Sequence, residues 1–248
     1  MSGSRKYKNP PVTEAIINFG FAEPIDSATI AKLKSKLHDE YPLSVDWKEM
    51  EVNFHAASRA TTFKDAVTGY RLSSLDQADI LILADTRFAV SRLAPYTGWE
   101  TLGDRAKRGW NDLRALTGYR AVSQIGIRYI NRVDIPVQVV DGREGGVRIE
   151  DYFEFYLEVK QPPFPGLSSH MMQAIFLLDN GKVIVNAGSV PSPLLNHGSY
   201  ALDIDVVRDK SVPQADQDIW AYVDSVREQK NQFFEASITD RCRALFDK

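Results

Sequence analysis

Cysteine and long apolar runs are both scarce in this sequence. Cys242 is the single cysteine, which excludes an internal disulfide and a zinc site built on several thiolates. A sequence without disulfide-forming cysteine pairs fits a reducing compartment. The most continuous apolar run, residues 80–84, is far shorter than the roughly 20 residues that span a bilayer. The basic start is not followed by the apolar stretch of a signal peptide. We therefore expect a cytoplasmic protein that does not cross a membrane.

An excess of basic residues is also missing. The 30 Lys and Arg residues face 33 Asp and Glu residues, giving a net charge of -3 and a pI near 5.9. Proteins that coat nucleic acid nonspecifically normally carry a basic excess, so this balance disfavours that class. The composition, 44% hydrophobic and 25% charged over 248 residues, instead indicates a folded chain able to bury a sizeable core.

Recognisable catalytic motifs are absent as well. The four histidines show no metal-ligand spacing, and no G-x-S-x-G, P-loop or G-x-G-x-x-G sequence occurs. Cys242 falls on an apolar helical stripe, which is typical of an inert core thiol. We expect no metal and no cofactor, and whether the protein is an enzyme stays open, with a noncatalytic role favoured.

Hydrophobic periodicity predicts the elements of the first half. Residues 12–21 alternate as a strand, and apolar residues recur at helical spacing from Ile30 to Leu37 after a helix start near Asp26. Four further extended runs follow, and a helical stripe from Trp99 ends at Gly118, where a C-terminal capping glycine belongs. The four predicted strands cover residues 47–55, 70–75, 79–84 and 87–93.

The second half repeats this order. A long strand over residues 120–135 precedes a short helix at 151–159, which ends before a Gln-Pro-Pro stop signal. Three strands follow, and one apolar helical stripe runs from Asp216 to the end of the chain. These strands cover residues 170–178, 182–190 and 200–208, with loops around 141–146 and over 191–199.

Strands clustered between helices favour antiparallel sheets with helices on one face, the α+β class. The recurring order predicts an internal duplication into two similar halves, residues 1–118 and 119–248, packed as one unit. The order strand, helix, strands, helix is analogous to the repeat of the TATA-box-binding-protein-like fold. That analogy concerns shape and does not fix a function.

Three segments carry a resemblance to a known family. They are the start YKNPPVTE from Tyr7, the centre IGIRYINR from Ile125, and the end FFEASITD from Phe233. Together they resemble a sporadically distributed family of bacterial proteins of similar length without an assigned activity. The resemblance implies a bacterial accessory-gene product, associated with mobile or defence-related neighbours, and it implies no reaction, cofactor or residue role.

The long central strand holds the best candidate site. Its alternation puts Gln124, Arg128 and Arg132 on one face, where two guanidinium groups could hold a phosphate or carboxylate. Asp203 and Asp205 have the same spacing on a later strand, and they could pair with the arginines, bind a metal or act as an acid and base. Charge pairing on an open sheet face is the more ordinary of these interpretations.

Three functions remain open from the sequence. The leading hypothesis is a noncatalytic binding or assembly protein that acts with a protein partner or with copies of itself, which should show exposed sheet edges and exposed aromatics. The second is an enzyme whose site, at the junction of the halves, is built from Arg128, Arg132, Asp203 and Asp205. The third is nucleic-acid binding by a saddle of two sheets, with the two arginines on phosphate and aromatic side chains stacking.

The predicted helix from Trp99 is rich in basic residues away from its apolar stripe. Its arginines and lysine are interspersed with acidic residues, so a solvated face is the default interpretation and a contact to phosphate or to an acidic partner is the alternative. The basic residues are Arg105, Lys107, Arg108 and Arg114.

Overall fold

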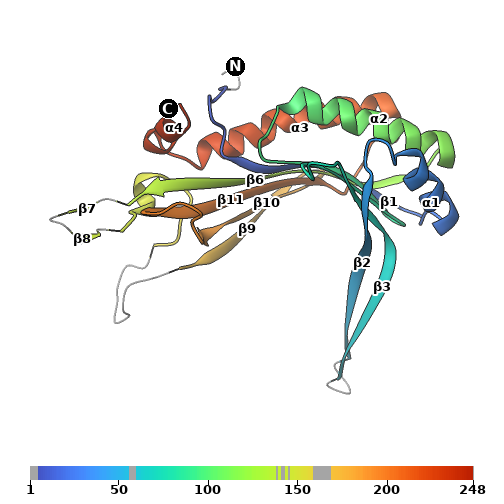
Figure 1. Ribbon diagram of the computed structural model, residues 1–248, viewed down its shortest axis with the longest axis horizontal. Helices are drawn as coiled ribbons and strands as arrows, with labels where there is room; N and C mark the ends of the chain where they lie inside the picture. The colour runs from blue at the N-terminus through green and yellow to red at the C-terminus, as the bar shows by residue number, and fades with distance from the viewer. Residues whose placement is uncertain are drawn as a thin grey trace. The chain divides into compact units, whose positions relative to one another are not determined.

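The computed structural model shows an α+β chain made of two compact units (Figure 1). It describes residues 5–55, 60–137, 139–140, 143–144, 146–158 and 169–247. We call residues 16–93 and 97–124 the N-terminal unit, and residues 1–15, 94–96 and 125–248 the C-terminal unit. No helix in the described part of the chain is long and apolar enough to cross a membrane.

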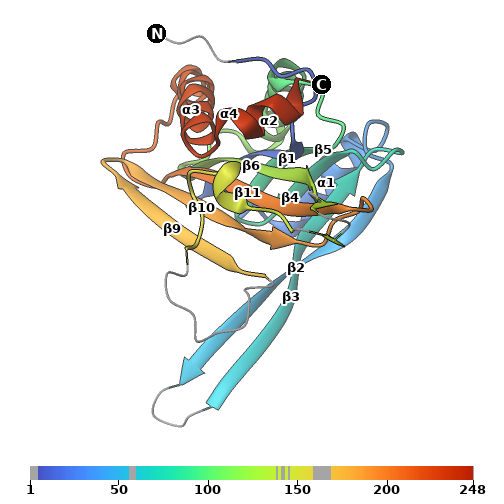
Figure 2. The same ribbon diagram turned by 90° about the vertical axis from the view of Figure 1, so that its left-hand side faces the viewer.

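The N-terminal unit combines an antiparallel sheet with two helices. The strand order is β2-β3-β4-β5-β1, and β2 and β3 form a long hairpin that projects from the rest of the unit (Figure 2). The elements are β1 (Val12–Phe21, whose first residues belong to the C-terminal unit), α1 (Ser27–Lys36), β2 (Leu43–His55), β3 (Ala60–Ser73), β4 (Asp79–Ala84), β5 (Arg87–Leu93) and α2 (Trp99–Thr117).

Local signals explain where these helices begin and end. The Asp26 carboxylate accepts a hydrogen bond from the Thr29 backbone N–H at 2.8 Å, which caps the start of α1. Gly118 ends α2 with a φ of +67°, a backbone conformation that disfavours residues with a Cβ. Both caps are among the features that the sequence predicts.

The N-terminal core forms around Trp110 of α2. Its ring is fully buried, with its centroid 4.7 Å from the ring of Phe19 and 6.3 Å from that of Phe88. The alternating burial of β1 turns Ile17, Phe19 and Phe21 to the same side. The predicted phase of this helix and strand is confirmed by that packing.

The C-terminal unit carries the remaining strands and helices. After the first residues of β1, the strand order is β6-β11-β10-β9, and the β6–β11, β11–β10 and β10–β9 pairs are antiparallel. Both α3 and α4 lie on the same side of these strands (Figure 1). The elements are β6 (Val122–Pro136), β7 (Val139–Val140), β8 (Arg143–Glu144), η1 (Ile149–Asp151), β9 (Met171–Leu178), β10 (Gly181–Val190), β11 (His197–Arg208), α3 (Asp216–Ala236) and α4 (Asp240–Phe246).

One row of side chains on each of these strands forms the core under α3. Tyr129 of β6 and Tyr200, Leu202 and Ile204 of β11 are buried on this covered face. The opposite rows of β6, β9, β10 and β11 form what we call the open face, because no helix of the described chain lies on it within this unit.

Two predicted helices differ from the structure. Residues 151–158 form no α-helix beyond the turn η1, because Phe153 pairs as a β-bridge with Ile238 and packs its ring 4.4 Å from that of Tyr200. The predicted helix from Asp216 to the end is two helices, separated at Ser237–Thr239. Thr239 caps α4 through its side chain, which accepts from the Cys242 N–H.

Several strands begin earlier than periodicity indicates. β2 begins at Leu43 rather than at 47, β3 at Ala60 rather than at 70, and β11 at His197 inside the predicted loop. β3 pairs with β2 along its whole length, so backbone pairing extends the hairpin through residues with weak alternation. Residues 141, 142 and 145 of the predicted glycine-rich loop, and residue 159 of the predicted helix, lie outside the described residues.

Candidate functional site

Strand register brings four of the five predicted site residues into the C-terminal unit. Asp205 lies directly opposite Arg128 in the β11–β6 pair, and Asp203 lies two residues away on the same face. Arg132 follows on the same row of β6. Gln124 belongs to the N-terminal unit, where it is half-buried beside Gly20.

Arg128 and Asp203 form a bidentate ion pair. The Arg128 Nε and Nη2 atoms donate to the two Asp203 carboxylate oxygens at 2.8 and 2.7 Å. The Asp203 side chain is 10% exposed and that of Arg128 is 41% exposed. This hydrogen bonding raises the pKa of the Arg128 guanidinium, which therefore stays charged. The pairing that the sequence analysis treats as the ordinary alternative thus forms between these two residues.

The ion pair continues as a chain of hydrogen bonds across four strands, which we call the polar ladder. Asn186 of β10 donates to the Asp203 carboxylate at 3.0 Å, and Gln173 of β9 donates to the Asn186 side-chain oxygen at 2.7 Å. Gln173 lies opposite Asn186, and Asn186 lies opposite Asp203, in the sheet register. The Gln173 Nε2 group is therefore engaged within the sheet. The neighbouring side chains of β9 are apolar.

The other predicted charged residues do not converge on Asp203. Arg132 pairs with Asp134 on its own strand at 3.1 Å, and Asp134 also accepts a short hydrogen bond of 2.5 Å from Ser199. Burial raises the pKa of Asp205, and Arg128 opposes that shift. The two arginines therefore engage different carboxylates.

The basic residues of α2 also have partners. Arg105 is buried, where it pairs with Asp79 and donates to the Ser91 carbonyl at 2.7 Å, so the expected solvated position is wrong for this residue. Arg108 lies 3.4 Å from Glu40. Arg114 donates to the Gly118 carbonyl at 3.2 Å. Arg105 thus links α2 to β4 and β5, which favours a structural role for this residue over phosphate binding.

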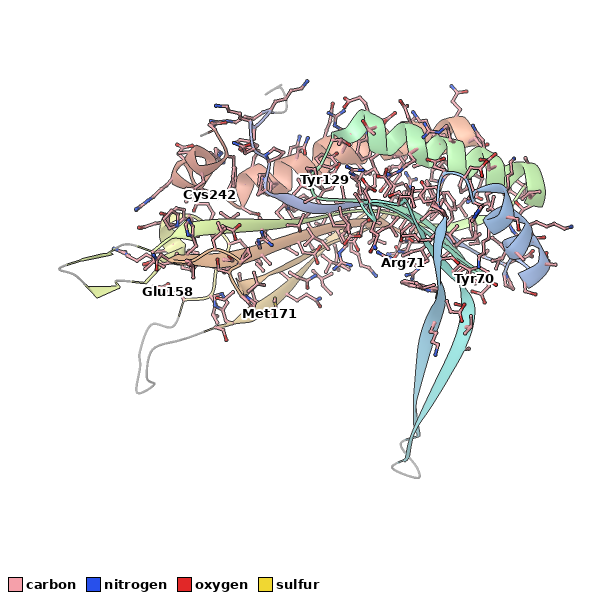
Figure 3. All side chains as sticks on the ribbon, in the orientation of Figure 1. Tyr70, Arg71, Tyr129, Glu158, Met171 and Cys242 are labelled. Carbon is pink, nitrogen blue, oxygen red and sulfur yellow. The ribbon has the colours of Figure 1, made fainter. Side chains whose placement is uncertain are left out.

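None of the predicted site residues lies on β9, the strand at the outer end of this sheet. Its residues, MMQAIFLL, include no charged side chain. On the open face Met171, Ile175 and Leu177 are 64%, 53% and 84% exposed, and on the other face Phe176 is 42% exposed. Figure 3 shows Met171 at the start of β9 on the side away from α3. The uncharged apolar run can be recognised in the sequence, but its position at a sheet edge depends on the strand order.

The backbone of β9 also presents hydrogen-bonding groups outward. Ser189 of β10 donates its N–H to the His170 carbonyl at 2.9 Å, which identifies that pair as a hydrogen-bonded one. Antiparallel pairs alternate, so Met172, Ala174 and Phe176 bond to β10. The N–H and C=O groups of the residues between them, Met171, Gln173, Ile175 and Leu177, point away from β10, where the described chain supplies no further strand.

The strand at the outer end of the N-terminal sheet provides a contrast. β2 carries Asp46, Lys48, Glu49 and Glu51 within its 13 residues. Charged residues on edge strands discourage pairing with another chain, and β2 has this protection. β9 has no charged residue, so of these two edge strands β9 is the one suited to accept another strand.

A cavity of about 640 Å³ lies in the C-terminal unit, at the ends of β10 and β6 and the start of β11. Two of its polar lining residues contact other side chains: Ser199 donates to Asp134, and the His170 Nε2 atom lies 3.2 Å from the Tyr200 hydroxyl. None of the five predicted site residues lines it. Its lining is Val137, Gly146, Val147, Ile149, Glu150, Tyr156, Leu157, Glu158, His170, Ser189, Val190, Gly198 and Ser199.

Two further titratable groups are buried in the C-terminal unit. The Lys230 ammonium lies 3.6 Å from the centroid of the Tyr129 ring, whose hydroxyl is 2.8 Å from that of Tyr96. Burial lowers the pKa of Lys230 to about 7. Burial also raises the pKa of the Cys242 thiol to about 12, which leaves it protonated and unreactive. Among the described residues, no three His, Cys, Asp or Glu side chains gather as a metal site.

The chain has a distant likeness among solved structures. No family model matches the chain, and no curated protein matches it. Among solved structures, the crystal structure of DynU16, a protein in the dynemicin biosynthetic locus, aligns over 96% of this chain and 98% of its own. The sequence identity is 11% and the TM-score is 0.20, so the likeness carries no argument about this chain.

Proposed function

We propose that this chain is a noncatalytic binding and assembly protein, which docks a protein partner along β9 and the adjoining open face of the C-terminal unit. The observation that carries the proposal is the uncharged edge strand. It has outward backbone groups and exposed apolar side chains on both faces. Unprotected edges of this kind are rare in isolated soluble proteins, because they template pairing with another chain.

The charges of the open face support binding rather than chemistry. Arg128 is paired with Asp203 and Arg132 with Asp134, so each guanidinium already has a carboxylate partner within the chain. The nucleic-acid and enzyme hypotheses both need these groups to face a ligand. A face of paired charges and hydrogen-bonded amides beside an apolar edge is the pattern of a protein-docking surface.

The internal duplication and the TATA-box-binding-protein-like analogy belong to the same proposal. The order of the first half supports the analogy, because β1, α1, four strands and α2 follow as the sequence predicts. Between β6 and β9 the described residues of the second half form the turn η1 and no α-helix, so the second half departs here from the order of the first.

Photo-crosslinking in living cells tests the proposal. A benzophenone amino acid replaces Leu177 on β9, and the matched control carries it at Leu75, an equally exposed leucine on a turn of the N-terminal unit. We expect one discrete adduct from position 177 and none from position 75. No adduct from position 177, or the same adducts from both positions, would overturn the docking function.

A further inference from the structure

We infer that the strand that docks on β9 is β9 of a second copy of this chain, running antiparallel about a two-fold axis. This inference rests on the proposed function and names its partner. It predicts a closed dimer in which the two C-terminal sheets join edge to edge.

Exposure on both faces indicates a strand rather than a flat surface as the occupant. Ile175 and Leu177 are exposed on the open face, and Phe176 between them is exposed on the opposite face beside Phe233. A partner lying against one face of the sheet would cover one of these rows. A strand added at the edge covers both rows and also satisfies the outward N–H and C=O groups.

The charge pattern indicates that this strand is a second β9. In an antiparallel pair about a two-fold axis, each segment meets its own sequence. A charged edge such as β2 would place charged side chains along such a pair, whereas MMQAIFLL places apolar side chains and one glutamine there. The Gln173 Nε2 group donates to Asn186, so this donor is already satisfied within the chain.

Proline at position 175 separates edge pairing from the fold of the chain. The Ile175 N–H points away from β10, so Ile175→Pro removes an outward donor and keeps the β9–β10 hydrogen bonds. Ile175→Lys places a charge on the edge without touching the backbone. The control is Leu75→Lys, which adds the same charge at an exposed leucine away from β9.

Sedimentation velocity of the purified full-length chain over a wide concentration range gives the dissociation constant. We expect a dimer for the parent and for Leu75→Lys. Each edge substitution is present twice in the dimer, so it should raise the dissociation constant at least about tenfold. Circular dichroism checks that both variants fold. If Ile175→Pro does not fold, the dissociation constant of Ile175→Lys alone tests the edge pairing.

Four outcomes would overturn the second-copy inference: a strict monomer at every concentration, a dimer that neither edge substitution weakens, a dimer that Leu75→Lys weakens equally, and open-ended aggregation in place of a closed dimer. The crosslinking experiment keeps the two proposals distinguishable. An adduct from position 177 with a mass other than twice that of the chain refutes the second copy while the docking function stands.

Discussion

Replacing Trp110 by alanine should remove the largest side chain from the core of the N-terminal unit. The ring is fully buried among Phe19, Phe21 and Phe88. A tryptophan buries roughly 200 Å², and at about 25 cal/mol per Å² its loss corresponds to about 5 kcal/mol. Because the alanine Cβ stays buried and neighbours relax partly, we expect Trp110→Ala to lower the free energy of unfolding by about 3–5 kcal/mol.

Thermal unfolding followed by circular dichroism measures this loss. In a chain of this size each kcal/mol lowers the midpoint by about 2–4 °C, so the expected drop is on the order of 10 °C. Trp220→Ala is the matched control, because Trp220 on α3 is only half-buried and should cost less. A Trp110→Ala protein as stable as the parent would refute the assigned helix phase and the packing built on it.

Two charged residues of the C-terminal unit give further predictions. Burial lowers the pKa of Lys230 to about 7, below its value in the unfolded chain, so between these two pH values the unfolded chain binds the extra proton and the free energy of unfolding rises with pH. Denaturant unfolding from pH 7 to 10 should show this rise in the parent, and Lys230→Met should flatten it. An unchanged slope in the variant would exclude Lys230 as the source of the rise. Arg128→Ala leaves the nearly buried Asp203 carboxylate without its cation and should cost about 1–2 kcal/mol, discounted for the part-exposed guanidinium. A melting temperature within a degree of the parent would show that the pair contributes nothing to stability.

The α+β class and most elements follow from local patterns in the sequence. β4 and β5 have the predicted bounds, and α2 runs from Trp99 to its glycine cap, because each has strong periodicity and a clear end signal. The helix predicted at 151–159 is wrong over its described residues, 151–158, because tertiary contacts determine their conformation. Phe153 forms a β-bridge with Ile238, which is distant in sequence. Periodicity within a short window cannot register such a contact.

The candidate site shows the same division. Alternation correctly puts Arg128 with Arg132 on one face of β6 and Asp203 with Asp205 on one face of β11. That these faces coincide, and which carboxylate pairs with which arginine, depends on strand register and side-chain reach. The importance of β9 depends on the strand order, which makes an ordinary apolar run into an exposed edge. Local patterns identify the residues of this strand, but they do not show that the strand lies at an edge of the sheet.

Hydrogen exchange at single backbone amides of β9 tests the edge-pairing account most directly. Amides of Met172 and Ala174 bond to β10 and should exchange slowly at every concentration. The amides of Gln173 and Ile175 point outward, so the account predicts slow exchange for them in concentrated solution and fast exchange after dilution. If the outward amides exchange as fast as loop amides at every concentration, no strand pairs with β9 and the account is contradicted.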